Sequence, residues 1–252
     1  MKIQVFFTHD GVSESLVKGK LIAVIDVLRM STTIVYAHAN GCERILPVES
    51  VEAASKLSAS LDKAVTLLGG EKEGKRIDGF DLGNSPLEYT REVVEGKNLI
   101  LSTTNGTRAI TKTREADEVV VGCFANMRPV LEHIARAGDK PIGLLCAGKQ
   151  GRFALEDAVC AGMMIDLLAN DGEVELDDAG VAARLLYLEH KASVPELVRN
   201  CEHGKYLAGI GFEKDLEVCA AVDSLNTLPV VSEGRIDRQK ARRKRAGKKR
   251  VA

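Results

Sequence analysis

Residues 21–33, LIAVIDVLRMSTT, decide the fold class of this chain. The stretch opens with a continuous apolar run, which is typical of a strand that is covered on both faces. It then changes to an acid, an arginine and three hydroxyls, and a helix is predicted from about residue 32 to 40, closed by Gly41. A buried strand followed by a helix is the unit from which parallel sheets are built, so the stretch predicts an α/β protein.

The same alternation repeats along the chain. Apolar strands are predicted within residues 43–48, 64–70, 97–103, 117–125 and 141–148, and a helical segment follows each of them. Ser50 and Ser85 are predicted to cap two of these helices, the second with Pro86 in its first position. The pattern predicts a three-layer α/β/α sandwich with a mainly parallel sheet. After about Gly172 the chain becomes rich in helices, which form either a second lobe or a cap on the sheet.

Composition sets the class of protein. The 252 residues are 45% hydrophobic and 28% charged, as expected of a globular protein. No run reaches the roughly 18 apolar residues of a membrane span, and the start MKIQVFF lacks the form of a signal peptide, so a cytoplasmic location without membrane contact is expected. The six cysteines are scattered, and we expect most of them to be reduced core residues.

The end of the chain is strongly basic. Residues 235–252 carry ten Lys or Arg against one Asp, and they contain little apolar surface to bury. We therefore predict one domain over residues 1–234, with a lobe boundary near 172 if there are two lobes, and a disordered basic tail over 235–252. A weak contact of this tail with RNA or another anionic surface is the alternative.

Polar residues gather where the predicted strands end, which is the ligand-binding edge of an open α/β sheet. Small hydroxyl, amide and glycine residues at these positions supply donors to an oxyanion. They are Ser31, Thr32, Thr33, Asn84, Ser85, Thr103, Thr104, Asn105, Gly106 and Thr107. Arg29 adds a planar fork that suits a phosphate or carboxylate.

Acidic residues lie at the same edge. They are Asp26, Glu71, Asp81, Glu156 and Asp157. Bare carboxylates would repel an anionic substrate, and a divalent cation removes that conflict. Mg²⁺ is the ion that suits a site made of oxygen ligands and some waters.

Other signals carry less weight. The stretch GGEKEGKR, residues 69–76, nearly matches a phosphate-binding P-loop, but Arg76 stands where a Ser or Thr must hold Mg²⁺. The histidines are dispersed, and only His203, in CEHGKYL, has a glycine-containing neighbourhood that suggests a substrate loop.

Six motifs occur in the order and spacing of a known family. They are VIDVLRMSTT, GGEKEG, GFDLGNSPLEY, STTNGT, CAGKQGRFALEDAVCAG and EHGKYLAGIGFEKDLEVCA. Over about residues 3–236 the chain resembles the ComB-like 2-phosphosulfolactate phosphatases. The resemblance implies an α/β/α fold and a Mg²⁺-dependent phosphatase that converts 2-phosphosulfolactate to sulfolactate and phosphate, a step towards coenzyme M.

The hypothesis that combines both arguments is metal-assisted hydrolysis of a phosphate ester on a small 2-hydroxy acid. Asp26, Arg29, Glu71 and Asp81 are the catalytic candidates, and Asp26, Glu71, Glu156 and Asp157 are the candidate Mg²⁺ ligands. Asp26 acts either as a metal ligand or as a nucleophile. The phosphoryl oxygens are bound by Arg29, Thr32, Thr33, Thr104, Asn105 and Thr107, and the other hydroxyl, amide and glycine residues above are further substrate-binding candidates. Arg152 and His203 bind the carboxylate or sulfonate.

Two alternatives stay open at this stage. The first is a phosphatase for another small phosphorylated 2-hydroxy acid, which would use the same residues. The second is a non-enzymatic protein that binds anions or RNA through the basic tail. The apolar late helices are suited either to cover the core or to pair two copies in a homodimer.

Overall fold

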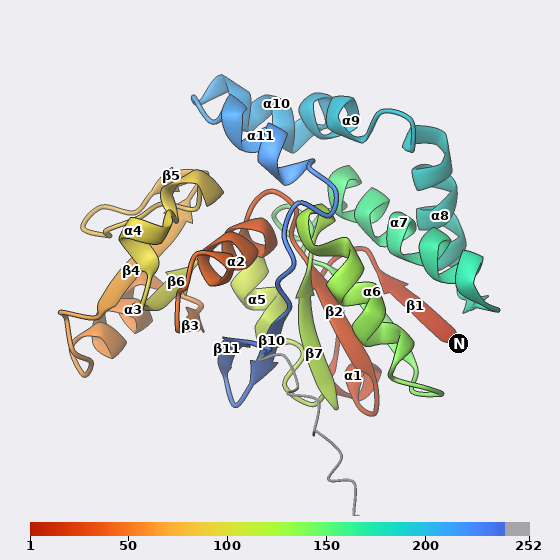
Figure 1. Ribbon diagram of the computed structural model, residues 1–252, viewed down its shortest axis with the longest axis horizontal. Helices are drawn as coiled ribbons and strands as arrows, with labels where there is room; N and C mark the ends of the chain where they lie inside the picture. Colours follow the sequence, from red (N-terminus) through yellow and green to blue (C-terminus); the bar gives the residue numbers. More distant parts are fainter. Residues whose placement is uncertain (240–252) are drawn as a thin grey trace, which may run out of the picture.

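One mixed sheet forms the centre of the molecule in the computed structural model, which describes residues 1–239 (Figure 1). The strands are β1 (Lys2–Phe6), β2 (Leu21–Ile25), β3 (Arg44–Val48), β4 (Thr66–Lys72), β5 (Lys75–Arg76), β6 (Asn98–Ser102), β7 (Glu118–Gly122), β8 (Ile142–Cys146), β9 (Glu175–Leu176), β10 (Pro229–Ser232) and β11 (Arg235–Arg238). Their order in the sheet is β5-β4-β6-β3-β11-β10-β7-β2-β8-β1-β9.

Apart from the short edge strand β5, which pairs antiparallel with β4, the sheet consists of two parallel blocks joined by a hairpin. Strands β4, β6 and β3 form one block, and β7, β2, β8, β1 and β9 form the other. The β10–β11 hairpin pairs antiparallel with the first residues of β3 on one side and with the first half of β7 on the other. The predicted mainly parallel sheet is confirmed, with this hairpin as the antiparallel insertion between its halves.

Helices cover both faces of the sheet. They are α1 (Glu14–Val17), α2 (Met30–Ala39), α3 (Val51–Ser58), α4 (Arg91–Val94), α5 (Gly106–Thr111), α6 (Met127–Ala135), α7 (Leu155–Asp171), α8 (Asp178–His190), α9 (Val194–Asn200), α10 (Glu202–Gly209) and α11 (Glu213–Cys219), with short 3₁₀ helices η1 (Pro86–Glu88) and η2 (Phe124–Asn126). The three-layer α/β/α sandwich is therefore confirmed.

Strand β2 shows why both faces must be covered. Leu21, Ala23 and Ile25 pack into the cluster that includes α6 and α7, whereas Ile22 and Val24 pack into the cluster that includes α2 and α5. All five residues are fully buried. Because successive side chains of a strand point to opposite faces, an uninterrupted apolar strand requires helices on each side.

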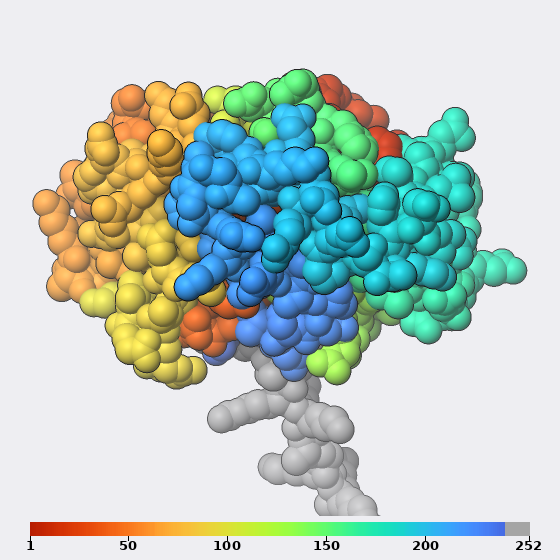
Figure 2. Space-filling view, turned by 90° about the horizontal axis from the view of Figure 1, so that it is seen from above, coloured from red at the N-terminus to blue at the C-terminus, as the bar shows by residue number. Residues whose placement is uncertain are grey.

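The last helices form a cap over the strand ends. Helices α9, α10 and α11 contribute Val198, Leu207 and Leu216 to the same buried cluster as β1, β2 and β8. Seen from above, they spread across the top of the molecule between the β4–β5 side and the α7–α8 side (Figure 2). Of the two arrangements that the sequence left open, the contacts of these helices are those of a cap on the sheet.

The end of the chain differs from the sequence prediction. Residues 235–238, assigned to a disordered tail, form β11 in the middle of the sheet, so the tail boundary at 235 is wrong. Ile236 is fully buried, and Arg235 donates from Nε to Asp237 at 2.8 Å, which places the charged side chains beside the ladder without breaking it. The rest of the predicted tail, residues 240–252, lies outside the described residues.

Three local predictions can be compared with the structure. The Ser50 hydroxyl accepts the backbone N–H of Ala53 and caps α3, as predicted. Ser85 makes no such cap. The six cysteines are free and buried, as predicted for core residues.

No helix within residues 1–239 is long and apolar enough to cross a membrane.

Candidate active site

A cavity of about 270 Å³ lies where the carboxyl ends of the two parallel blocks meet the cap. Its residues come from six segments: the β2–α2 loop, the β4–β5 hairpin, the loop between β5 and η1, the β6–α5 loop, the β8–α7 loop and helix α10. The polar lining residues are Asp26, Arg29, Glu71, Glu73, Asn84, Thr104, Asn105, Lys149, Gln150, Arg152, Glu202, His203 and Tyr206. The sequence prediction that the ends of separate strands form one site is thus matched by a shared cavity.

Asp26 lies at the end of β2 and is only 7% exposed. Its backbone N–H donates to the Ser31 hydroxyl at 2.9 Å, which fixes the turn from the strand into α2. Burial raises the pKa of Asp26 from 3.8 to about 7, and the nearby carboxylates of Glu71 and Glu156 act in the same direction, whereas the charge of His203 opposes them. The Asp26 carboxyl group therefore keeps its proton up to about pH 7, among other acidic side chains.

Glu71 connects two of the loops that form the cavity. Its carboxylate accepts the backbone N–H of Gly74 at 2.7 Å and that of Thr104 at 2.8 Å. These bonds hold the β4–β5 hairpin beside the β6–α5 loop. Glu71 remains partly exposed to the cavity, so it lies on the same surface as Asp26.

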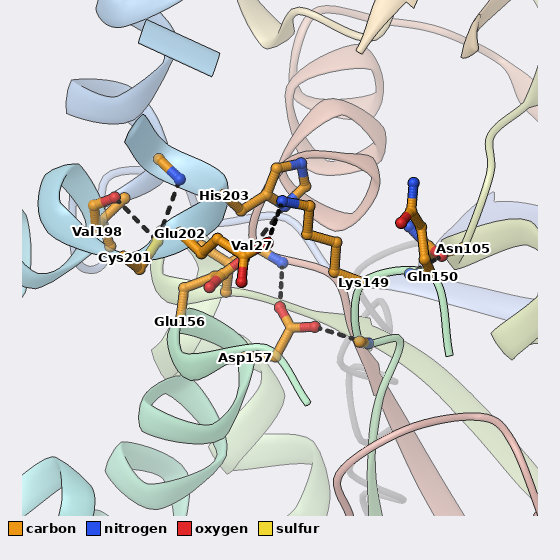
Figure 3. Close-up of polar contacts among 12 residues, drawn as sticks. Val27, Asn105, Lys149, Gln150, Glu156, Asp157, Val198, Cys201, Glu202 and His203 are labelled. Atoms are coloured by element: carbon orange, nitrogen blue, oxygen red, sulfur yellow. Dashed lines mark hydrogen bonds and ion pairs between the residues drawn. The ribbon is translucent and has the colours of Figure 1, made fainter. Parts of the chain in front are cut away.

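Glu156 and Asp157 begin α7 beneath the cavity, and each already has polar partners (Figure 3). The Asp157 carboxylate accepts the N–H groups of Val27 at 2.9 Å and Gly148 at 3.1 Å. Burial, followed by the charges of Glu156 and Asp26, raises the pKa of Asp157 well above its usual range. Glu156 Oε1 lies 3.2 Å from Nδ1 of His203. Neither acid is among the residues that line the cavity.

Arg29 is fixed by residues that are distant in sequence. One guanidinium nitrogen donates to Asp215 at 2.6 Å, the other donates to the Gly74 carbonyl at 2.5 Å, and the group stacks 4.2 Å above the Phe212 ring. The Asp215 carboxylate also accepts the Ser85 hydroxyl at 2.6 Å. The ion pair is almost fully buried, with side-chain exposures of 2% and 3%, so Arg29 presents a rigid cation to the cavity.

Most of the predicted hydroxyls serve the backbone and do not line the cavity. Thr32 donates to the Val27 carbonyl, Thr33 to the Asn84 carbonyl, and Thr107 to the Thr103 carbonyl. With Ser31 and Ser85 engaged as above, these residues shape the loops around the site. The prediction that these hydroxyls bind phosphate directly is therefore wrong, and they instead hold the backbone of the loops around the cavity.

Three of the predicted hydroxyl and amide residues do reach the cavity, namely Thr104, Asn105 and Asn84, and so do the predicted Arg152 and His203. Asn105 Oδ1 accepts the N–H of Gln150 at 2.8 Å and so joins the two parallel blocks across the site. Asn84 Oδ1 is buried and has no hydrogen-bond partner within residues 1–239. Such an atom suits a ligand that brings its own donor.

Gly106 is required by the close approach of the two blocks. A Cβ atom at this position would collide with the Asp26 carboxylate and with the Met30 side chain. This glycine therefore permits the start of α5 to lie against Asp26.

Asp81 is the predicted catalytic residue that the structure does not bring to the site. It is exposed, accepts the N–H of Leu68 at 2.8 Å and does not line the cavity. The loop after β4 turns back and pairs with the strand at Gly69 and Leu82, so the Asp81 side chain is used to close that loop.

Basic residues form the outer wall of the cavity. Lys149 Nζ donates to Glu202 at 3.0 Å and lies 5.3 Å from the centre of the Tyr206 ring, and Arg152 lies 3.7 Å from the same carboxylate. Tyr206 donates its hydroxyl to the Glu73 carbonyl at 2.8 Å and so ties the cap to the β4–β5 hairpin. The inner side of the cavity thus holds the acids Asp26 and Glu71 beside the buried Arg29, and the outer side holds the cations Lys149 and Arg152 beside the acids Glu73 and Glu202.

Sequence reasoning missed several of these residues. Lys149 and Gln150 lie in the stretch CAGKQGRF, three and two positions before the predicted Arg152, and the position of this loop at a strand end could have identified them. Asp215, Glu202 and Tyr206 lie on cap helices whose orientation no local pattern gives. Their roles follow only from the packing of the cap.

The donor set is compatible with Mg²⁺. Among the described residues no three acids, histidines or cysteines are arranged as a preformed metal site. Proteins commonly hold Mg²⁺ by one or two carboxylates together with waters and substrate phosphate, and Asp26 and Glu71 supply two on one wall. A cation there would favour the ionised form of Asp26, which burial and then the neighbouring carboxylates disfavour. The residues therefore fit the ion, and Mg²⁺ binding stays a prediction.

The fold and the cavity define an α/β enzyme whose site, at the ends of parallel strands, combines buried acids with fixed cations for a small anionic substrate. Residues 6–234 match the family model described as 2-phosphosulpholactate phosphatase. The chain belongs to this family, and it is a phosphatase, that is, a phosphoric monoester hydrolase.

Similar proteins from several bacteria cover nearly the whole chain. A protein of Caldanaerobacter subterraneus subsp. tengcongensis is 36% identical over 234 residues, covering 93% of this chain and 97% of its own length. A protein of Clostridium perfringens is 39% identical over 239 residues, with 94% and 96% covered, and one of Symbiobacterium thermophilum is 39% identical over 219 residues, with 86% and 94% covered. Each carries the name probable 2-phosphosulfolactate phosphatase.

Proposed function

We propose that this chain hydrolyses 2-phosphosulfolactate to sulfolactate and phosphate with the help of Mg²⁺. The observation that carries the proposal is a single cavity that holds two acids, Asp26 and Glu71, on its inner side and two cations, Lys149 and Arg152, on its outer side. The names of the similar proteins support the choice of substrate. A cytoplasmic location and a place in coenzyme M synthesis stay predictions.

The charge pattern suits a substrate that carries a phosphate and two further anionic groups. The phosphate is expected at the inner side, where Asp26 and Glu71 would hold Mg²⁺ and Arg29 offers a fixed guanidinium. The carboxylate and sulfonate are expected at the outer side, where Lys149 and Arg152 share a single exposed counter-ion, Glu202. An incoming anion can replace that carboxylate because its side chain is 74% exposed.

The chain's own residues then bind and orient the substrate. When bound, Mg²⁺ would neutralise charge on the phosphoryl oxygens. Arg29, immobilised by Asp215 and the Gly74 carbonyl, is preorganised to stabilise the charge that develops as the ester bond breaks. Asp26 stands at the end of β2, within the acidic group, as a metal ligand or as the nucleophile.

A phosphate-release screen over small phosphate esters, with Mg²⁺ and with chelator, tests the proposal. We expect the highest turnover on 2-phosphosulfolactate and loss of activity in chelator. If another phosphorylated 2-hydroxy acid is turned over faster, that ester takes the place of 2-phosphosulfolactate as the proposed substrate. Undiminished activity in chelator would refute the metal requirement. Rapid quench with radiolabelled substrate then separates a phospho-enzyme on Asp26 from direct attack by water.

A pair of matched variants tests the site itself. Asp26→Asn should raise the barrier by about 3 kcal/mol or more, roughly a 150-fold loss, the scale expected for one preorganised electrostatic group. Asp81→Asn removes an acid from the neighbouring loop outside the cavity, and near-wild-type turnover is expected. Equal losses in the two variants would contradict the placement of the site.

A further inference from the structure

Glu156 and His203 form a carboxylate–histidine pair across the boundary between the sheet layer and the cap. Glu156 lies in the first turn of α7 and His203 in the first turn of α10, 47 positions later. The carboxylate is 3% exposed and the imidazole 16%, and Nδ1 lies 3.2 Å from Oε1. Figure 3 shows the His203 ring above Glu156 and close to Lys149.

This contact leaves the second ring nitrogen free. An imidazole directs its two nitrogens away from each other, so a ring whose Nδ1 faces Glu156 turns Nε2 away from that carboxylate. Nε2 has no hydrogen-bond partner among residues 1–239, and His203 lines the cavity. Its charge also acts on Asp26, where it opposes the rise in the pKa of that carboxyl group. His203 is therefore within electrostatic reach of the inner side of the site.

Hydrolysis of an alkyl phosphate needs a proton at the leaving oxygen, because an alkoxide is a poor leaving group in neutral water. Asp26 is assigned to the metal or to phosphorus, and three other lining donors are either engaged or unable to give up a proton. Lys149 donates to Glu202, Tyr206 donates to the Glu73 carbonyl, and Arg29 stays protonated in proteins. His203 is the lining residue with a ring nitrogen that is both free and able to give up a proton.

We propose that His203 is the general acid of the reaction and that Glu156 is a positioning residue that holds its ring. As the ester P–O bond breaks, its electron pair stays on the leaving oxygen, which takes the proton from Nε2. Water supplies an OH group to phosphorus and releases its second proton to solvent, from which the imidazole is reprotonated. The products are the alcohol and phosphate.

The role of His203 does not depend on the identity of the nucleophile. Attack by water and attack by the Asp26 carboxylate release the same alkoxide, and both need the same proton. The inference rests on the proposed phosphatase function of this cavity. It moves His203 from substrate binding to catalysis, and it gives Glu156 a role other than metal binding.

The test compares leaving groups. His203→Gln should lower kcat about 100- to 10,000-fold on 2-phosphosulfolactate, or on whichever alkyl ester the wild type hydrolyses best. On p-nitrophenyl phosphate, whose leaving group departs without a proton, the loss should stay below about tenfold. Glu156→Gln should show the same split with smaller losses. If the substituted residue had a merely structural role, the substitution would lower the activities on the alkyl ester and on p-nitrophenyl phosphate equally.

A matched histidine provides the control. His133 is also partly buried and lies 3.1 Å from a carboxylate, that of Glu118, but outside the cavity. His133→Gln should leave both activities unchanged. Equal losses on the two substrates in His203→Gln, or no loss on either, would overturn the inference.

Two further measurements keep the test decisive. If His203→Gln does not fold, as judged by circular dichroism, the wild type is assayed over a series of leaving groups. A shallow dependence of kcat on leaving-group pKa supports a general acid, and a steep one refutes it. Failure of the wild type to hydrolyse 2-phosphosulfolactate overturns the proposed substrate only, because the comparison of alkyl and aryl esters is unaffected by it.

Discussion

Replacing Asp26 by Asn should stabilise the folded chain above neutral pH while it removes activity. The wild-type carboxyl group titrates at a pKa of about 7 in the folded chain, against 3.8 as its ordinary value. At about 1.4 kcal/mol per pH unit, the ionised side chain then costs the folded state about 4 kcal/mol. An asparagine of nearly the same shape carries no such cost.

The stabilisation depends on pH in a defined direction. The folded chain keeps a proton on Asp26 up to about pH 7, whereas the unfolded chain loses it above about pH 4. Wild-type stability contributed by this group is thus present at pH 4 and lost as the pH rises to 7. The difference between Asp26→Asn and wild type should be close to zero near pH 4 and largest above pH 7.

Thermal unfolding in chelator measures the effect without a contribution from metal binding. For a chain of this size, about 4 kcal/mol corresponds to a rise in Tm of roughly 10 °C at pH 8. Asp81→Asn, at an exposed position, is the control and should leave Tm nearly unchanged. A variant Asp26→Asn that melts at or below the wild-type temperature at pH 8 would refute the reasoning.

Three further substitutions probe the site. Gly106→Ala should lower activity at least about tenfold and stability by about 1–3 kcal/mol, as measured by turnover and urea unfolding, because the new methyl group must displace the Asp26 carboxylate. Asp215→Ala should cost about 3–5 kcal/mol in urea unfolding, because it leaves the buried charge of Arg29 without a partner. Lys149→Gln should raise KM for 2-phosphosulfolactate about tenfold and change KM for p-nitrophenyl phosphate much less, because only the first substrate carries further anionic groups.

Each of these changes has a matched control. Gly172→Ala introduces a methyl group into open space at an extended backbone position and should change neither activity nor stability by much. Glu95→Ala breaks the exposed pair with Arg91 and should cost less than about 1 kcal/mol. Lys140→Gln removes a lysine outside the cavity and should leave both KM values unchanged. A control as damaging as its partner would contradict the corresponding argument.

Much of the fold was predictable because its signals are local. The uninterrupted apolar run of β2 predicted a strand buried on both faces, and Ser50 predicted the start of α3. Strand β11 was missed because charge dominated the composition of residues 235–252. A strand needs backbone partners and few apolar contacts, and the single buried Ile236, between Arg235 and Asp237, supplies enough.

The candidate site was predictable only in outline. Asp26 and Glu71 were placed correctly on the shared cavity because parallel strands bring their carboxyl ends to one edge. The hydroxyls near them were assigned to a ligand, but Thr32 and Thr33 bond to carbonyl groups of their own surroundings. Ser and Thr satisfy backbone groups as readily as substrates, and their position in the sequence does not distinguish the two uses.

The sequence by itself determined the α/β/α class, the edge of the sheet that carries the chemistry and the family, since periodicity and motif order are properties of the chain. The tertiary structure decided which polar groups face the cavity and which are already paired. Arg29 meets Asp215 at a separation of 186 residues, and Val27 meets Asp157 at a separation of 130. Such pairs form only when α7 and the cap pack on the sheet, because no local propensity links residues so far apart.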